Sequence, residues 1–199
     1  VILNQKNLLA FSAGVDSSAL FFLLLEQSIP FDIAIVNYNL RVQSKDEVFY
    51  AKNLASKYKK NIFLKETKIE NISNFEKNAR DIRYKFFDEI ILENSYENLI
   101  TAHQLNDKLE WFMMQITKGA GLVELIGFND FEHKENYKIY KPLLQITKEE
   151  LQKYLKQNNL KYFIDNSNFD EKYKRNFFRH NFSDKLLEEF KEGIKKSFD

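Results

Sequence analysis

The sequence has no cysteine, no apolar run of membrane-spanning length, no signal-peptide pattern and no excess of either charge. Without cysteine, its 199 residues cannot form a disulfide, a thiolate metal site or a cysteine nucleophile. The lack of a long apolar run and of a signal peptide predicts a cytoplasmic protein that does not enter a membrane. Because the formal net charge is only +1, any contact with nucleic acid must come from a local basic patch.

Strand and helix patterns alternate along the first part of the chain. With a hydrophobic content of 44%, the chain can bury one substantial core. Apolar and β-branched segments predict strands over residues 8–11, 31–37, 61–65 and 98–102. Helices are predicted from residue 15 to just before Pro30 and over residues 45–58, 73–94 and 105–118, the third opened by a capping box at Ser73. This alternation predicts an α/β fold, with a mostly parallel, doubly wound sheet and helices on both faces.

A short loop of small polar residues, 12–17, joins the first predicted strand to the first helix. The unpaired N–H groups and the positive end of the helix dipole predict an anion site at this loop. Gly14 allows close approach of a ligand to the backbone, and the hydroxyls of Ser12 and Ser17 can donate to phosphate oxygens. Asp16 can orient a donor or hold Mg²⁺. The alternative is that Asp16, Ser17 and Ser18 merely cap the helix.

The alternation stops after Gly119, Ala120 and Gly121. We therefore assign residues 1–127 to a nucleotide-binding core and residues 128–199 to a mainly helical extension of the same domain. In the extension, the sequence predicts a strand over 137–140, a helix over 147–159, a strand over 160–164, a polar turn over 165–168 and a last helix from Arg175 to the end.

A second polar group follows the fourth predicted strand. His103, Asp107 and Glu110 have i, i+4, i+7 spacing, which places them on one face of a helix at the carboxyl edge of the sheet. Two carboxylates at that edge attract a cation. Two alternatives remain open: a solvated helix face with an incidental histidine, or a metal site with nitrogen and oxygen ligands.

Residues 172–180 interleave cations with aromatic residues. This pattern is typical of surfaces that contact phosphates and unstacked bases. The alternative is a core face made by Phe177, Phe178 and Phe182. We expect a mixture in which the phenylalanines pack while Arg175 and Arg179 face RNA or the active site.

Several segments, taken in order, resemble the tRNA(Ile)-lysidine synthetases of the ATP pyrophosphatase, or PP-loop, superfamily. Residues 12–17 are similar to the Ser-Gly-Gly-x-Asp-Ser loop of that family, with Ala13 in place of a glycine. If the backbone of Ala13 must have a positive φ, its Cβ costs on the order of 1 kcal/mol. The other matching segments are 36–41, 79–84 (Ala-Arg-Asp-Ile-Arg-Tyr), 102–111, 119–122, 141–144, 165–168 and 175–180 (Arg-Asn-Phe-Phe-Arg-His).

The resemblance implies a carbon–nitrogen ligase that uses ATP, Mg²⁺ and free lysine. Such an enzyme adenylates the wobble cytidine of tRNA(Ile) with a CAU anticodon and converts it into lysidine, releasing AMP and pyrophosphate. The ATP-binding residues are then Ser12, Ala13, Gly14, Val15, Asp16 and Ser17, with Asp16 as the metal ligand. The expected catalytic residues are His103, Asp107, Glu110 and Arg83, of which Asp107 and Glu110 bind lysine and His103 or one carboxylate is the base. The expected tRNA contacts are Arg41, Arg175 and Arg179.

Other functions are compatible with the loop alone. A tRNA thiolase activates a base in the same way but delivers sulfur, and the lack of cysteine disfavours cysteine-mediated transfer. Amide-forming relatives such as NAD or GMP synthetases leave the later motifs unexplained. A non-enzymatic adenine-nucleotide sensor has no need for His103, Asp107 and Glu110 on one face. The additional tRNA-gripping domain usual in the family is not expected within these residues, and both a monomer and a homodimer remain open.

Overall fold

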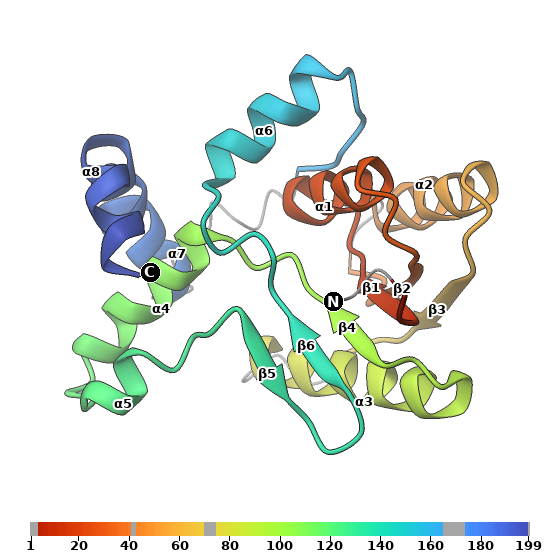
Figure 1. Cartoon of the computed structure of the whole chain (residues 1–199), viewed down its shortest axis with the longest axis horizontal. Helices are drawn as coiled ribbons and strands as arrows, with labels where there is room; N and C mark the ends of the chain where they lie inside the picture. The colour runs from red at the N-terminus through yellow and green to blue at the C-terminus, as the bar shows by residue number, and fades with distance from the viewer. Residues whose placement is uncertain (1–3, 41–42, 70–74, 165–173, 199) are drawn as a thin grey trace.

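The computed structural model describes residues 4–40, 43–69, 75–164 and 174–198 (Figure 1). Within them, one sheet has the strand order β3-β2-β1-β4-β6-β5. The strands are β1 (Asn7–Ala10), β2 (Asp32–Asn37), β3 (Ile62–Glu66), β4 (Asn98–Ile100), β5 (Phe131–His133) and β6 (Lys138–Tyr140). All pairings are parallel except that of β5 with β6, which confirms the predicted mostly parallel sheet.

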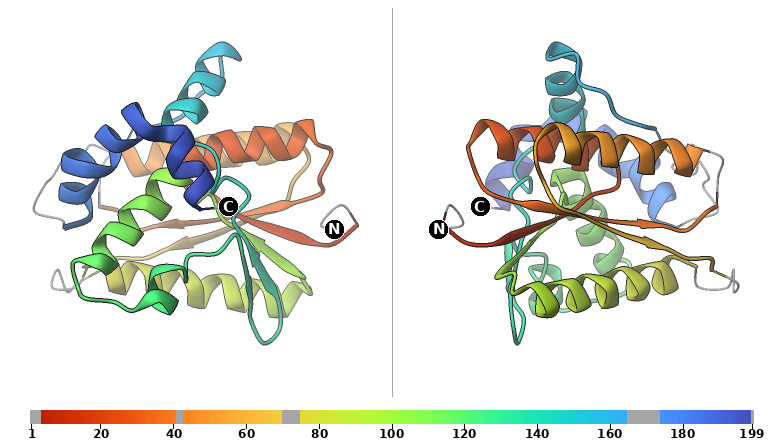
Figure 2. Two further views of the ribbon diagram at one scale, coloured as in Figure 1. Left: turned by 60° about the vertical axis from the view of Figure 1, so that its left-hand side comes forward. Right: turned by 90° about the vertical axis from the view of Figure 1, so that its right-hand side faces the viewer.

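Helices cover both faces of this sheet. They are α1 (Val15–Glu26), α2 (Gln43–Lys57), α3 (Phe75–Asn94), α4 (Leu105–Ile116), α5 (Leu122–Leu125), α6 (Lys148–Gln157), α7 (Lys174–Phe178) and α8 (Asp184–Ser197), and a π-helical turn, η2 (Arg179–Ser183), joins α7 to α8. Figure 2 shows α1 and α2 on one face and α3 on the other, which confirms the doubly wound arrangement. In the described ranges, no helix combines the length and the apolar character that crossing a bilayer requires.

Two apolar layers hold the helices to the sheet. Leu9 on β1 packs in the layer that contains Phe21 of α1, whereas its neighbour Leu8 faces the opposite layer with Ile91 of α3. Successive residues of a strand point to opposite faces, so a sheet covered on both sides needs almost continuous apolar strands. Polar side chains with a chemical role must therefore lie beyond the strand ends.

The order of the strands places two loops side by side. The chain runs from β1 outward through β2 and β3, and then returns to the other side of β1 to form β4 and β6. This reversal creates a topological switch point between β1 and β4, where open parallel sheets bind their ligands. Residues 11–14 leave the carboxyl end of β1, and residues 101–104 leave that of β4. Both loops lead directly into helices, α1 and α4.

Several predictions for the second half of the chain were wrong. Residues 160–164 form only one bridge, between Phe163 and Gly14, because β2 and β4 already occupy both edges of β1. The short strand β5 and the helix α5 were not predicted, and η2 interrupts the predicted last helix. The extension also contributes β5 and β6 to the sheet, while the boundary at residue 127 stays a prediction. The polar turn 165–168 and the capping residue Ser73 lie outside the described residues.

Candidate active site

The serine side chains of the loop before α1 form hydrogen bonds within the loop and do not cap the helix. Gly14 is the N-cap residue of α1, with an extended backbone and no side-chain capping bond. The Ser12 N–H donates to Ser17 Oγ over 3.1 Å, and the two hydroxyl oxygens lie 3.0 Å apart. The interpretation of Asp16, Ser17 and Ser18 as simple caps is therefore wrong. The start of α1 retains N–H groups and a dipole end suited to an anion.

Ala13 has a φ of 61°, in the left-handed region, as expected for a residue that replaces glycine. Its side chain is fully buried, and its carbonyl oxygen accepts a hydrogen bond of 2.9 Å from the Phe163 N–H. The left-handed conformation of an L-residue costs about 1 kcal/mol or slightly more. The contact with residue 163 explains how the loop holds this conformation.

Asp16 is a half-buried carboxylate with an incompletely satisfied side chain. Its Oδ1 atom is buried and accepts no hydrogen bond from the described part of the chain. Burial, followed by the nearby Asp107 carboxylate, raises the pKa of Asp16 to about 7, while Lys148 and Arg179 act in the opposite direction. The side chains of Asp16 and Asp107 thus lie within electrostatic range across the switch point. One carboxylate together with substrate phosphates is a usual way for a protein to hold Mg²⁺.

The first turn of α4 fixes the position of Asp107. The Gln104 side chain accepts a hydrogen bond of 2.6 Å from the Asn106 N–H, and Asp107 Oδ2 accepts one of 3.1 Å from the Gln104 N–H. The other oxygen, Oδ1, accepts from the guanidinium of Arg175. Burial pushes the pKa of Asp107 upward, but Arg175, His103, the Gln104 N–H and Arg179 together hold that pKa below its ordinary value. Asp107 is therefore ionised and oriented.

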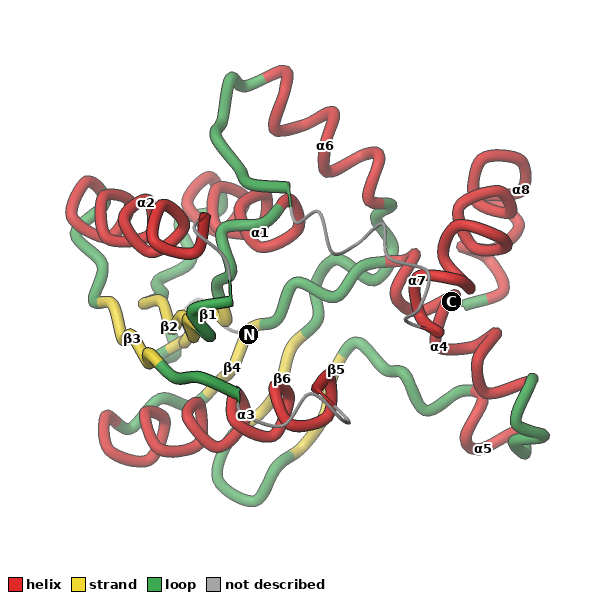
Figure 3. Tube along the Cα trace, turned by 180° about the vertical axis from the view of Figure 1, so that it is seen from behind, coloured by secondary structure: helices red, strands yellow, loops and turns green. Residues whose placement is uncertain are grey.

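Two arginines form ion pairs with the acidic residues Asp107 and Glu110 of α4. Glu110, which is fully buried, accepts hydrogen bonds from Arg175 Nε at 2.8 Å and from Arg179 Nε at 2.6 Å. Arg179 Nη2 adds a third bond of 3.1 Å to the same carboxylate. Figure 3 shows α7, which carries Arg175, alongside α4. The predicted attraction of a cation is thus realised by the chain itself, and the solvated-face alternative is wrong.

The two arginines differ in exposure. The Arg175 side chain is 41% exposed, whereas that of Arg179 is 11% exposed. The neighbouring carboxylates raise the pKa of Arg175, in the order Asp107 and then Glu110, despite the opposing effect of burial. Burial likewise lowers the pKa of Arg179, but its bonds to Glu110 outweigh burial and raise it. Both guanidiniums therefore stay charged, and Arg175 is the more accessible of the two.

His103 lies at the same edge as a neutral imidazole. Its Nδ1 is 2.9 Å from Thr101 Oγ1, and its ring lies edge-on to Phe128, with 5.5 Å between the ring centres. Burial lowers the pKa of His103 to about 4; Asp107 opposes this shift, and the cations Arg175, Lys141 and Arg80 reinforce it. Among the described residues, no three histidine, aspartate or glutamate side chains form a group that could hold a metal ion. The metal-site alternative for His103, Asp107 and Glu110 is therefore wrong.

Other predicted residues are placed differently. Arg83 is exposed on α3 and lies within electrostatic range of Tyr38, so its catalytic role stays a prediction. Arg41 lies outside the described residues. The phenylalanines pack only in part, because Phe178 is buried while Phe177 and Phe182 are 42% and 40% exposed.

Sequence reasoning assigned no site role to three cations of this region. Lys148, at the start of α6, acts on the pKa of Asp16, and Arg80 and Lys141 act on that of His103. Lys148 and Arg80 are separated from the groups they influence by more chain than any local pattern covers. Lys141 follows the strand β6, but only the sheet order reveals that β6 lies beside β4.

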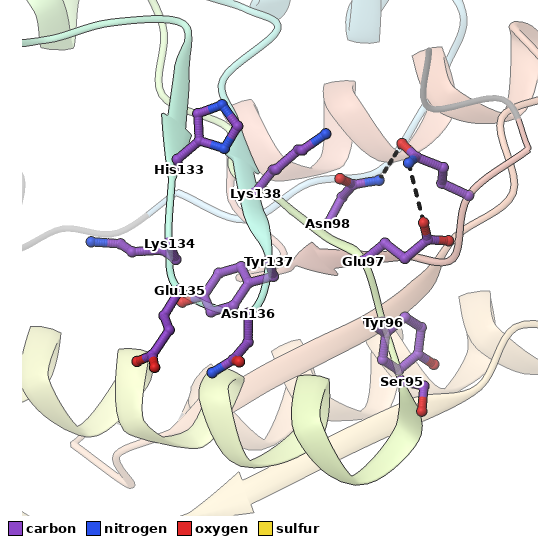
Figure 4. A pocket seen from close by; sticks show the side chains of 11 residues that line it. Ser95, Tyr96, Glu97, Asn98, His133, Lys134, Glu135, Asn136, Tyr137 and Lys138 are labelled. Carbon is purple, nitrogen blue, oxygen red and sulfur yellow. Dashed lines mark hydrogen bonds between the residues drawn. The ribbon is translucent and has the colours of Figure 1, made fainter.

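The pocket shown in Figure 4 lies at the opposite end of the sheet. It has a volume of about 490 Å³ and lies where β4 and β6 begin. Its lining residues are Gln5, Ser95, Tyr96, Glu97, Asn98, His133, Lys134, Glu135, Asn136, Tyr137 and Lys138. None of the predicted site residues is among them.

The sequence is similar to known proteins over almost its whole length. The model of the PP-loop domain family matches residues 3–186. A tRNA(Ile)-lysidine synthase of Campylobacter jejuni (strain RM1221) is 51% identical over 194 residues, which are 97% of this chain and 60% of that protein. The enzyme of the same name from Helicobacter hepaticus is 52% identical over 201 residues, covering 98% of this chain and 47% of the relative. The chain thus spans about half the length of the curated relatives that it matches.

A solved structure shows the same fold. The U34-tRNA thiolase NcsA from Methanococcus maripaludis, solved with its 4Fe-4S cluster, matches with a TM-score of 0.81 at 22% identity. The match covers 99% of this chain and 72% of the thiolase. At this level of identity, the likeness concerns the fold alone.

Proposed function

The chain belongs to the PP-loop domain family, and on this premise we propose that the protein is an ATP-dependent ligase that converts the wobble cytidine of tRNA(Ile) with a CAU anticodon into lysidine. The observation that carries the proposal is the buried pair Asp107 and Glu110, held within electrostatic range of Asp16 at the switch point. A pair of buried carboxylates near a phosphate-binding loop suits a reaction between ATP and a cationic amino acid. The names of the curated relatives support the choice of lysine and tRNA(Ile).

In the first step, cytosine O2 attacks the α-phosphorus of ATP, and pyrophosphate leaves. The N–H groups at the start of α1 bind and orient the phosphates, and the helix dipole stabilises the charge that develops on the leaving group. Asp16, with its buried and unpartnered oxygen, is the residue that would hold Mg²⁺ beside those phosphates. When bound, Mg²⁺ would neutralise part of the phosphate charge.

In the second step, the ε-nitrogen of lysine attacks C2 and AMP leaves with the former O2. The ammonium group of lysine first replaces the guanidinium of Arg175, the more exposed arginine, on Asp107 and Glu110. Its ordinary pKa of about 10.4 leaves far less than 1% neutral amine at pH 7. The two carboxylates raise that pKa and Arg179 opposes the rise through like charge, so the amine becomes a nucleophile only when a base removes its proton. The neutral His103 then accepts the proton, because both carboxylates are engaged in ion pairs.

An activity as a thiolase is less well supported. None of the 199 residues is cysteine, so none can ligate an iron–sulfur cluster or carry sulfur as a thiolate. The proposed location is the cytoplasm, where tRNA and ATP are available. A homodimer stays a prediction, which sedimentation of the purified full-length protein at several concentrations would test.

The decisive experiment uses the full-length protein with ATP, lysine and a tRNA(Ile) that bears a CAU anticodon. We expect pyrophosphate release that requires both lysine and this tRNA, and mass spectrometry should find lysine covalently added to the tRNA. A methionine tRNA with the same anticodon is the control. Equal pyrophosphate release with that tRNA and no lysine would contradict the proposal.

A further inference from the structure

Lys141 is a buried lysine without a role in the reaction described above. It follows β6 directly and is only 4% exposed. Its Nζ donates to Glu132 Oε1 at 2.5 Å and to the carbonyl oxygen of Asn129 at 2.9 Å, and it lies 5.3 Å from the centre of the Phe128 ring. Its backbone N–H donates to the carbonyl oxygen of Asp130 at 2.7 Å. One residue therefore ties the segment before β5 to the end of β6.

This segment covers His103. The Phe128 ring lies edge-on to the imidazole and 5.8 Å from the ring of Trp111 on α4. Thr101 Oγ1 engages the imidazole Nδ1. Phe128 contacts the ring, and Thr101 occupies Nδ1. The second ring nitrogen, Nε2, is therefore the atom that we assign to proton transfer.

We propose that Lys141 is a positioning residue that keeps His103 neutral and correctly oriented, through its hold on Phe128 and through its own positive charge. The inference rests on the proposed function only in assuming that His103 exchanges a proton with substrate. The contacts from Lys141 to Phe128 and from Phe128 to His103 do not depend on the identity of that substrate.

Charged groups from four elements surround the imidazole. Arg175 of α7, Arg80 of α3 and Lys141 beyond β6 oppose its protonation, and Asp107 of α4 favours it. Burial acts in the same direction as the cations and is the largest influence, and the Phe128 ring is one of the groups that pack on the imidazole. Loss of the Lys141 side-chain charge removes one like charge and releases the ring that shields the imidazole from water. Both changes raise the pKa of His103.

The test is an NMR titration of His103 in the full-length protein and in the Lys141→Met variant. We expect this variant to raise the imidazole pKa from about 4 by one unit or more, toward the ordinary value near 6.5. Lys134→Met is the matched control, because Lys134 lies 3.9 Å from the same Glu132 carboxylate but is exposed to solvent. It should leave the titration unchanged. Variants of His133 and His180 assign the signals.

A second variant tests the route through the aromatic ring. Phe128→Leu retains the lysine charge and weakens the cover, so it should raise the pKa of His103 by less than Lys141→Met does. This variant also provides the test if Lys141→Met fails to fold. If Lys141→Met folds and the titration of His103 is unchanged, the proposal is overturned. If Lys141→Met does not fold, an unchanged titration of His103 in Phe128→Leu overturns it.

The two proposals can fail separately. The titration uses no substrate, so absence of lysidine formation would refute the proposed function and leave the positioning role intact. If lysidine does form, the acidic limb of the kcat profile should move to higher pH in Lys141→Met by the same amount as the NMR pKa. An active Lys141→Met enzyme with an unmoved limb would contradict the positioning role alone.

Discussion

Charged side chains are exposed to solvent at one end of the parallel sheet and buried at the other. At the amino end, the pocket is lined by charged side chains such as Glu97, Lys134 and Glu135, which are exposed to water. At the carboxyl end, Glu110 is completely buried and the Arg179 side chain is 11% exposed. Removing charges from water costs several kcal/mol per ion, which close pairing repays only in part. Buried charged side chains therefore indicate the reactive end of this molecule better than the position of the pocket does.

The largest expected contrast between the two ends is in stability. Glu110→Gln leaves two guanidiniums without their buried carboxylate and should lower the free energy of unfolding by about 3–5 kcal/mol. Glu97→Gln at the amino end, where the carboxylate accepts solvent-exposed hydrogen bonds from Gln5 and Lys6, should change it by less than about 0.5 kcal/mol. Urea denaturation followed by circular dichroism measures both. Equal losses would remove the contrast.

A second contrast concerns lysine. Asp107→Asn retains an oxygen for the Gln104 N–H but removes the charge, so KM for lysine should rise about 10- to 100-fold, as expected for one charge-assisted hydrogen bond. Asp88→Asn is the control, because Asp88 accepts a hydrogen bond from Tyr137 near the amino-end pocket. Steady-state kinetics of lysidine formation should show no change in that variant. An unaltered KM in Asp107→Asn would exclude its role in binding lysine.

The third contrast is a dependence on pH. With its pKa raised to about 7, Asp16 is mainly protonated below pH 7 and ionised above it in the ligand-free protein. Because only the ionised form binds a cation, affinity for Mg²⁺ with ATP should fall about tenfold for each pH unit below 7. Calorimetric titration on both sides of pH 7 measures the slope. Asp16→Asn should flatten it, and a slope that survives this substitution would assign the titration to another group.

The smallest effect concerns two residues with positive φ, one at each end. Ser95 at the amino end has φ 55° and is exposed, so Ser95→Gly should stabilise the fold by about 0.5–1 kcal/mol. At the carboxyl end, Ala13→Gly relieves the same strain but loses a buried methyl group worth about 0.8 kcal/mol. The free energy of unfolding should then change by less than about 0.5 kcal/mol. Thermal denaturation that finds equal gains would show that the Ala13 methyl contributes no packing energy.

Local patterns were enough to predict the sheet, the loop 12–17 and the shared face of His103, Asp107 and Glu110. The strands of the sheet are visible as apolar segments, and the loop and the helix face each follow directly after one of these strands. The partners of the carboxylates were not predictable in the same way, because Arg175 lies 65 residues beyond Glu110 in the sequence. Only the folded chain brings α7 to α4. The edge strand β5, Phe-Glu-His, offers only one apolar residue, and α5 buries none of its side chains, so neither shows the pattern of a half-buried element.

The turn η2 determines how the last helix faces the rest of the molecule. Leu187, on α8 just beyond the turn, packs with Leu105 and Leu109 of α4, and Lys191 and Lys195 reach Glu150 on α6. Deleting a single codon within η2 would rotate α8 by about 100° relative to α7. All these partners would be lost at once, while Arg175 kept its place. Insertions and deletions in this turn are therefore far more damaging than most replacements of its surface residues.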